Sequence, residues 1–168
     1  MALVVLAGVA LYLDNLWWQP TRSNGIAFSH QVHVGERQID CGYCHRGARG
    51  SDFAGVPSVS DCAGCHAIIK EYKGPQTALK PKFDAELQKL QQHLKDKTPI
   101  PWAKYYDLSE HVKFSHQAHV AKGVDCAACH GDVAKSNEIR LVNQPGMGWC
   151  ISCHKEKKAP LDCSVCHF

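Results

Sequence analysis

Apolar residues form long or periodic runs in two places along the chain of 168 residues. One is the N-terminal run MALVVLAGVALYL, which is followed by DNLWW. The other is KFDAELQKLQQHLKDK (82–97), where apolar residues recur with the i, i+4, i+7, i+11 spacing of an amphipathic helix of about three turns. Those residues are Phe83, Leu87, Leu90 and Leu94. Two prolines that follow end the predicted helix, which either covers the seam between neighbouring parts or offers a docking surface to another subunit.

The N-terminal run predicts a partial transmembrane anchor over residues 1–18. Thirteen helical residues extend roughly 20 Å and eighteen about 27 Å, against a hydrocarbon core of about 30 Å. The paired Trp17 and Trp18, followed by Gln-Pro-Thr-Arg, are typical of a membrane–water interface. A cleaved signal peptide is the alternative, but no basic residue precedes the run and its Trp-Trp exit is unlike a small-residue cleavage site. Either interpretation sends the remaining residues across a membrane.

The ten cysteines form five Cys-x-x-Cys pairs, and each pair is followed at once by histidine. With 11 histidines in 168 residues, chance gives this arrangement odds of roughly one in a million. Cys-x-x-Cys-His is the attachment sequence for c-type haem, in which both thiols form thioethers and the histidine is the proximal iron ligand. Zinc ribbons, redox dithiols and disulfide frameworks do not require a histidine after every pair. The predicted attachment residues are Cys41, Cys44, Cys62, Cys65, Cys126, Cys129, Cys150, Cys153, Cys163 and Cys166, and the proximal ligands are His45, His66, His130, His154 and His167.

Five haem c groups change the expected fold and charge. The macrocycles supply an apolar interior that the sequence otherwise lacks, so we expect a mostly irregular, short-helical multihaem cytochrome c with a haem-packed core and little β structure. The formal charge of +3 becomes about −7 if ten haem propionates ionise (3 − 10). The basic apo-sequence is therefore no argument for nucleic-acid binding. Because bacteria attach c-type haem outside the inner membrane, the globular part is expected in the periplasm, anchored to that membrane.

A heptapeptide occurs twice, as FSHQVHV (28–34) and FSHQAHV (114–120), at an offset of 86 residues. Each copy is followed by attachment motifs, seven or eight residues after its second histidine. This internal repeat divides the chain into a dihaem unit (26–69), a linker with the amphipathic helix (70–113) and a trihaem unit (114–168). Ser29 and Ser115 are suited to cap a short helical turn that carries the two histidines of each copy.

Electron-transfer haems normally take a histidine or methionine as the sixth, distal ligand. The heptapeptides provide four candidates, and two imidazoles so close in sequence are expected to serve two neighbouring haems. The fifth distal ligand is predicted as Met147, in PGMGWC, with His111 as the alternative; His93, on the amphipathic helix, is a further competitor. The four heptapeptide candidates are His30, His33, His116 and His119.

The heptapeptide followed by Cys-x-x-Cys-His resembles the class III cytochromes c, in which the first histidine serves the nearby haem and the second serves another. The whole motif order is similar to the membrane-anchored pentahaem cytochrome c subunits of alternative complex III, including PIPWAKYYDLSEHVKFSHQAHV, CAACHG and MGWCISCH. The resemblance implies electron transfer within a respiratory complex that oxidises quinol, with integral-membrane and periplasmic subunits as partners and a c-type cytochrome or an oxidase as the acceptor.

Two other functions compete with an electron-transfer subunit. A multihaem reductase needs an iron with an open coordination position, and enough candidate ligands are present here to close all five. A stand-alone, membrane-anchored quinol dehydrogenase that feeds periplasmic reductases is the stronger alternative, although no feature of the sequence specifies a quinol pocket.

Overall fold

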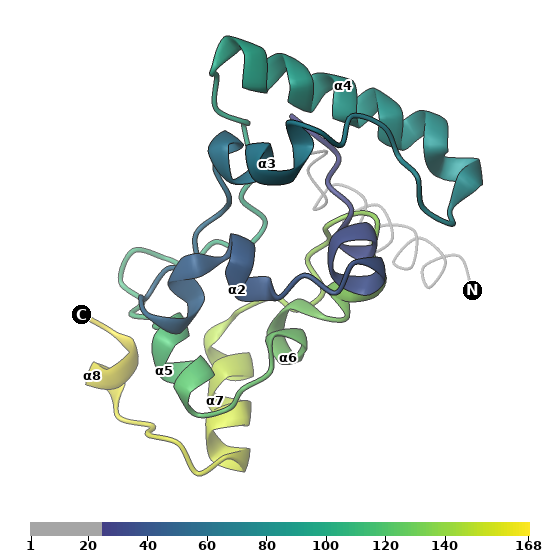
Figure 1. Ribbon diagram of the computed structural model, residues 1–168. Helices are drawn as coiled ribbons and strands as arrows, with labels where there is room; N and C mark the ends of the chain where they lie inside the picture. The colour runs from purple at the N-terminus through teal and green to yellow at the C-terminus, as the bar shows by residue number, and fades with distance from the viewer. Residues whose placement is uncertain (1–24) are drawn as a thin grey trace, which may run out of the picture.

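The computed structural model describes residues 25–168, and its regular structure is short helices joined by long loops (Figure 1). The expected helical character is confirmed: the described residues contain no strand, and their one isolated β-bridge joins Val112 to His167. The helices are η1 (Gln31–Glu36, a π-helix), α2 (Cys41–Cys44), η2 (Arg46–Arg49), α3 (Val59–His66), η3 (Thr77–Leu79), α4 (Lys80–Asp96), α5 (His116–Ala121), α6 (Cys126–His130), η4 (Val133–Lys135), α7 (Met147–Glu156) and α8 (Cys163–Cys166).

The anchor predicted over residues 1–18 lies outside the described residues. Within residues 25–168, none of the helices combines the length and the apolar character needed to cross a lipid bilayer.

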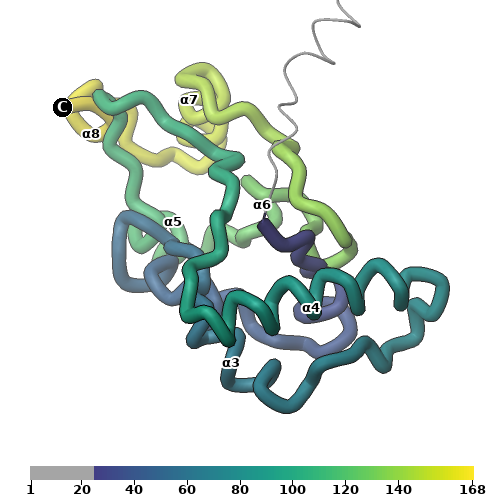
Figure 2. Tube along the Cα trace, turned by 90° about the horizontal axis from the view of Figure 1, so that it is seen from above, coloured from purple at the N-terminus to yellow at the C-terminus, as the bar shows by residue number. Residues whose placement is uncertain are grey.

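Helix α4, the longest described helix, forms where the apolar spacing predicts it. A proline in its first turn suits a helix start, and Lys97 ends it with a left-handed backbone (φ 56°). Its apolar face packs on α3, and the two helices lie side by side in both views (Figures 1 and 2). Ile26, Leu90 and Ile100 form the buried cluster there, surrounded by the partly buried Val59, Cys62, Leu87, Leu94 and Trp102. The helix therefore covers the second attachment motif.

Two segments of the chain dock on each other reciprocally. We call residues 28–66 the first repeat and residues 114–154 the second. Helix η1 of the first repeat packs on η4 of the second, and α5 of the second packs on η2 of the first. The amide of Gln31 donates to the carbonyl of Ser136 at 2.9 Å, and the amide of Gln117 donates to the carbonyl of Ser51 at 3.0 Å. Since positions 31 and 117 are equivalent in the repeat, the contact is close to two-fold symmetric.

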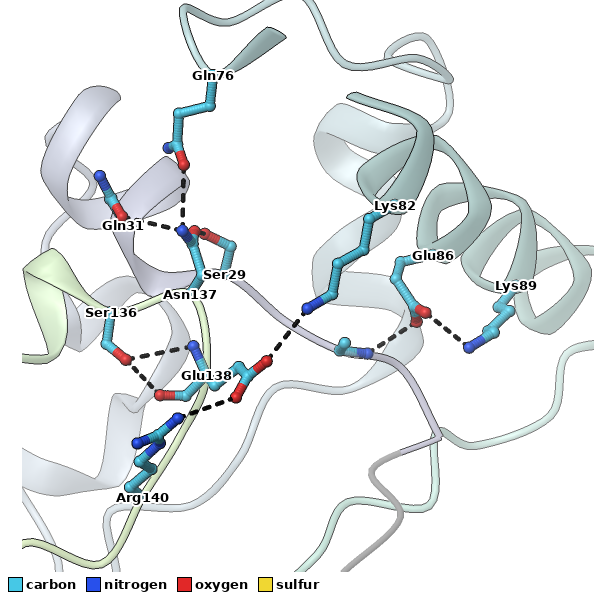
Figure 3. Close-up of polar contacts among 11 residues, drawn as sticks. Ser29, Gln31, Gln76, Lys82, Glu86, Lys89, Ser136, Asn137, Glu138 and Arg140 are labelled. Atoms are coloured by element: carbon cyan, nitrogen blue, oxygen red, sulfur yellow. Dashed lines mark hydrogen bonds and ion pairs between the residues drawn. The ribbon is translucent and has the colours of Figure 1, made fainter. Parts of the chain in front are cut away.

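A polar junction joins the two repeats and the linker (Figure 3). The side-chain amide of Asn137 donates to Gln31 at 3.0 Å and to Gln76 at 3.1 Å, while Ser29 donates to its carbonyl oxygen at 2.5 Å. The neighbouring Glu138 pairs with Lys82 of α4 at 3.1 Å. One residue thus holds together segments that are far apart in the sequence.

The apolar core of the polypeptide is small. Among residues 25–168, the buried hydrophobic residues are Ile26, Tyr72, Phe83, Leu90 and Ile100. All of them lie near α4 or in the segments next to it, and none is in α6, α7 or α8. The helices that carry the last three attachment motifs therefore have no apolar core of their own.

Candidate haem centres

Each attachment motif forms a short helix or the body of one. Four of the five motifs have an aspartate directly before the first cysteine. In two of them its carboxylate caps the motif helix: Asp40 accepts from Gly42 N at 2.8 Å and Asp125 accepts from Ala127 N at 2.7 Å. In α3 the preceding aspartate, Asp61, completes a capping box with Ser58. These aspartates are recognisable in the sequence but were not predicted as helix caps. Their hydrogen bonds stabilise the helical turn that carries both cysteines.

Both heptapeptide serines accept a hydrogen bond at the start of their helices; Ser115 is the N-cap of α5, whereas the N-cap residue of η1 is His30. Ser29 Oγ accepts from Val32 N at 3.1 Å in η1, and Ser115 Oγ accepts from Ala118 N at 3.3 Å in α5. Both turns present their histidines at i and i+3. The first copy is a π-helix and the second an α-helix. Single π-helical turns are frequent at functional sites.

The first histidine of each heptapeptide lies beside the histidine of the first attachment motif in its repeat. The rings of His30 and His45 (pair 1) have centroids 6.4 Å apart and are nearly parallel, at 5°. The rings of His116 and His130 (pair 3) are 6.5 Å apart, also at 5°.

The second histidine of each heptapeptide reaches the second motif, with a different ring angle. His33 and His66 (pair 2) lie 6.0 Å apart at 53°, and His119 and His154 (pair 4) lie 6.0 Å apart at 54°. Both repeats therefore reproduce one parallel pair and one tilted pair.

A phenylalanine holds the second histidine of each heptapeptide in this geometry. Phe28 stacks on His33 at 4.3 Å, and Phe114 stacks on His119 at 4.7 Å. Each phenylalanine also presents its ring at a steep angle to the first histidine, His30 or His116. Aromatic packing of this kind restricts the rings before any ligand is bound.

Backbone carbonyls accept a hydrogen bond from Nδ1 of six of these histidines. A carbonyl can only accept, so Nδ1 carries the proton and Nε2 keeps a free lone pair for a metal. The bonds are His33 to Ser29 (2.8 Å), His119 to Ser115 (2.7 Å), His45 to Gly55 (2.7 Å), His116 to Asp52 (2.8 Å), His66 to Ile69 (2.9 Å) and His154 to Pro160 (2.7 Å).

The fifth motif histidine lies beside His111. The rings of His111 and His167 (pair 5) are 5.4 Å apart at 20°, and the chain segments that carry them are joined by the Val112–His167 bridge. Met147 begins α7 with 65% of its surface exposed, three residues before the fourth motif. His93 instead bonds Thr98 Oγ1 at 3.0 Å, on the outer helix α4.

Comparison with known proteins identifies the family. Residues 112–168 match the family described as cytochrome c7 and related cytochrome c. The chain is 31% identical, over 95% of its length and 87% of the relative's, to the menaquinone reductase, multihaem cytochrome c subunit, of Nitratidesulfovibrio vulgaris. The chain belongs to the multihaem cytochromes c. It is also 28% identical to the high-molecular-weight cytochrome c of the same organism, over 64% of this chain and 23% of that protein.

Multihaem cytochromes c carry covalently bound haem c, and the residues present fit that group. An imidazole nitrogen binds a transition metal at about 2 Å, so two rings on opposite sides of one iron have centroids roughly 6 Å apart. Pairs 1 to 4 have this separation, and pair 5 is slightly closer. Each pair contains the histidine that follows two free cysteine thiols.

Burial keeps several of these imidazoles neutral, the form that binds metal. Burial, followed by the nearby His45, lowers the pKa of His30 to about 4. Burial also lowers the pKa of His33 and of His130. A neutral ring near pH 7 is ready to donate its nitrogen lone pair without first losing a proton.

Cysteine thiols of different motifs lie close enough to influence one another's pKa. Burial raises the pKa of Cys44, and the nearby Asp61, Cys41 and Cys65 add to the effect. Burial also raises the pKa of Cys126, together with Cys41, with which it shares a hydrogen bond.

The same influence extends through the second repeat. Burial raises the pKa of Cys129, with the adjacent Cys153 and Cys150 contributing, and the pKa of Cys150 is raised by burial and by Cys166. The motifs therefore follow one another in the order 62–66, 41–45, 126–130, 150–154 and 163–167, consistent with the path from α3 through α2 and α6 to α7 and α8 in Figure 1.

Proposed function

We propose that this multihaem cytochrome c binds five haems, one at each histidine pair, and transfers electrons along them. The observation that carries the proposal is the occurrence of five histidine pairs, each with its own Cys-x-x-Cys. A bound haem supplies one-electron iron chemistry between the ferric and ferrous states. At each pair two cysteine thiols would attach the group and the two imidazoles would hold its iron, which would leave no position for a substrate.

We assign His111, in preference to Met147, as the distal ligand at the fifth motif. The support is the stacked pair with His167, against a methionine that is largely exposed and precedes the fourth motif. His111→Ala is expected to convert one of five haems from low-spin to high-spin, whereas Met147→Ala leaves all five low-spin. The reverse pattern in the electron paramagnetic resonance spectrum would restore Met147 as the ligand.

The spatial order of the motifs supports a linear path with pairs 1 and 3 in the middle. Pair 2, beneath α4, forms one end, and pair 5, beside the C-terminus, forms the other. The reciprocal contact between the repeats joins the halves of this path where pairs 1 and 3 meet. Electron transfer over such a row requires neighbouring groups to be held at fixed separations, which is what the docked repeats provide.

The cytochrome is proposed as a subunit of a membrane quinone oxidoreductase, with integral-membrane and periplasmic subunits as partners and the globular part in the periplasm. The relative in N. vulgaris is a subunit of a menaquinone reductase. The motif order resembles alternative complex III, where electrons leave quinol instead. We favour quinol oxidation with a c-type cytochrome or an oxidase as acceptor, and the menaquinone reductase similarity makes electron delivery to quinone the second candidate.

Extraction of native membranes in mild detergent tests these proposals together. A haem-stained band of a large assembly, with this chain among polytopic subunits and haems that quinol reduces, is the expected result. If quinol does not reduce the haems of this assembly but the haems pass electrons to quinone, the proposed direction of electron transfer is reversed. A band near the mass of this chain, still reduced by quinol, would establish a stand-alone quinol dehydrogenase.

A further inference from the structure

One short loop contacts a histidine from each of two neighbouring pairs. The loop, residues 51–55, follows the first attachment motif. Its Gly55 carbonyl accepts from Nδ1 of His45 at 2.7 Å, and its Asp52 carbonyl accepts from Nδ1 of His116 at 2.8 Å. His45 belongs to pair 1 in the first repeat, and His116 belongs to pair 3 in the second.

The equivalent segment of the second repeat does not make the matching contact. Its Asn137 uses its side chain to bind Gln31, Gln76 and Ser29. His30, the counterpart of His116, has a buried Nδ1 with no hydrogen-bond partner in the described part of the chain. The shared contact is therefore specific to the 51–55 loop and is not a general consequence of the repeat.

The position of the loop depends on a close backbone approach at Gly47. The amide of Gly47 donates to the carbonyl of Ala54 at 3.0 Å. A Cβ at position 47 would lie 2.0 Å from the carbonyl oxygen of Phe53, so any side chain there displaces the loop. The other end of the loop is held by the second repeat, because the amides of His116 and Gln117 donate to Asp52 and Ser51.

We propose that the 51–55 loop is a shared positioning element for two haem centres, which sets the donor strength of His45 and His116 together. The inference rests on the proposed ligation by these two histidines. A hydrogen bond from Nδ1 makes an imidazole a stronger donor and stabilises the ferric state, so it lowers the reduction potential. Displacement of one loop then raises the potentials of both haems at the middle of the row.

The test compares Gly47→Ala with Gly50→Ala in the fully loaded protein. A Cβ at position 50 would meet no atom within 4 Å, and the φ of Gly50 is −135°, so alanine there leaves the loop in place. Potentials of the individual haems are measured by electrochemical reduction followed by electron paramagnetic resonance. Gly47→Ala is expected to shift two of five haems upward, and Gly50→Ala none. A shift of one haem only, of all five, or of none with Gly47→Ala overturns the proposal.

A second measurement covers the case in which Gly47→Ala fails to load its haems. In the reduced wild-type protein, exchange of the Nδ1 protons is followed by nuclear magnetic resonance. Opening of one loop exposes both protons, so His45 and His116 are expected to share one exchange rate that differs from those of His66 and His154. Unrelated rates for His45 and His116 reject the shared loop. A high-spin haem at pair 1 or pair 3 in the wild type would instead reject the proposed ligation.

Discussion

The two repeats place their histidine pairs alike but hold the segments after the first motif differently. In both, the first pair is parallel at 5°, and the second is tilted at 53° or 54°. In the first repeat, the following loop offers backbone carbonyls to His45 and His116. In the second, the corresponding segment is fixed through the side chain of Asn137.

The difference between the repeats shows which structural features depend on neighbouring residues in the sequence and which depend on distant ones. Ring geometry depends on contacts inside the heptapeptide, namely the stacked phenylalanine and the carbonyl of Ser29 or Ser115. Those residues are repeated in the sequence, so the geometry is repeated. The backbone contacts between the docked repeats are equivalent, but the side-chain contacts beside them depend on residues about 60 to 110 positions away, such as Gln76 and Asn137, and there the two repeats differ.

The largest expected effect follows from withholding haem from both repeats at once. Chain exported without haem attachment is expected to lose its whole folding free energy, typically 5–15 kcal/mol for a domain, because its apolar core is confined to the region of α4. Circular dichroism and amide hydrogen exchange check this. A haem-free chain with protected amides in α6 and α7 would contradict it.

Removal of one attachment site at a time tests whether the motif in the middle of the row matters more for holoprotein yield than the motif at its end. Cys126→Ala with Cys129→Ala deletes the motif where the repeats meet and is expected to reduce the yield of holoprotein by an order of magnitude or more. The matched pair Cys163→Ala with Cys166→Ala is expected to give stable protein with four haems. Haem staining and intact mass measure both, and equal losses would show that the centre of the row has no special structural role.

A core substitution tests the region that distinguishes the first repeat. Leu90 is 6% exposed in the cluster between α4 and the segments around α3. Leu90→Ala is expected to cost about 2–5 kcal/mol of unfolding free energy. Denaturation by guanidinium, followed through the haem spectrum, measures the loss. Lys95→Ala on the exposed side of α4 is the control, and a cost near zero at Leu90 would mean that haem contacts alone hold α4.

The smallest effect concerns Asp52 and Asn137, which are equivalent when counted from the first cysteine of the preceding motif, Cys41 or Cys126. Asn137→Ala leaves Gln31, Gln76 and Ser29 without their shared partner and is expected to cost about 1–3 kcal/mol. Asp52 contributes its backbone, so Asp52→Ala is expected to stay within about 0.5 kcal/mol of the wild type. The same denaturation experiment compares them, and equal costs would remove the distinction between the loops.

Much of the candidate site was predictable because its residues belong to short sequence motifs. The five Cys-x-x-Cys-His motifs and the capping serines follow from spacing alone, as does α4 from its apolar period, while haem attachment at each motif stays a prediction. The aspartate caps were readable and missed. The sequence favoured Met147 over His111 as the fifth distal ligand because Met147 lies three residues before a motif, whereas the structure places His111 beside His167, 56 residues away in the sequence, and leaves Met147 exposed.

The placement of the repeats could not be predicted for a related reason. Gln31 meets Ser136, and Gln117 meets Ser51, through backbone groups that every residue has. Such contacts leave no signature in side-chain type. The glycine at 47, which makes room for the 51–55 loop, is one of 13 glycines and stands out only when the approach of Phe53 is seen.

The most direct test of the central claim is near-infrared magnetic circular dichroism of the fully oxidised protein, combined with a haem count from its intact mass. The charge-transfer band distinguishes bis-histidine from histidine–methionine ligation at each low-spin iron. Five haems per chain, all bis-histidine, is the predicted result. A histidine–methionine band, or fewer than five haems, would contradict the assignment of one histidine pair to each attachment motif.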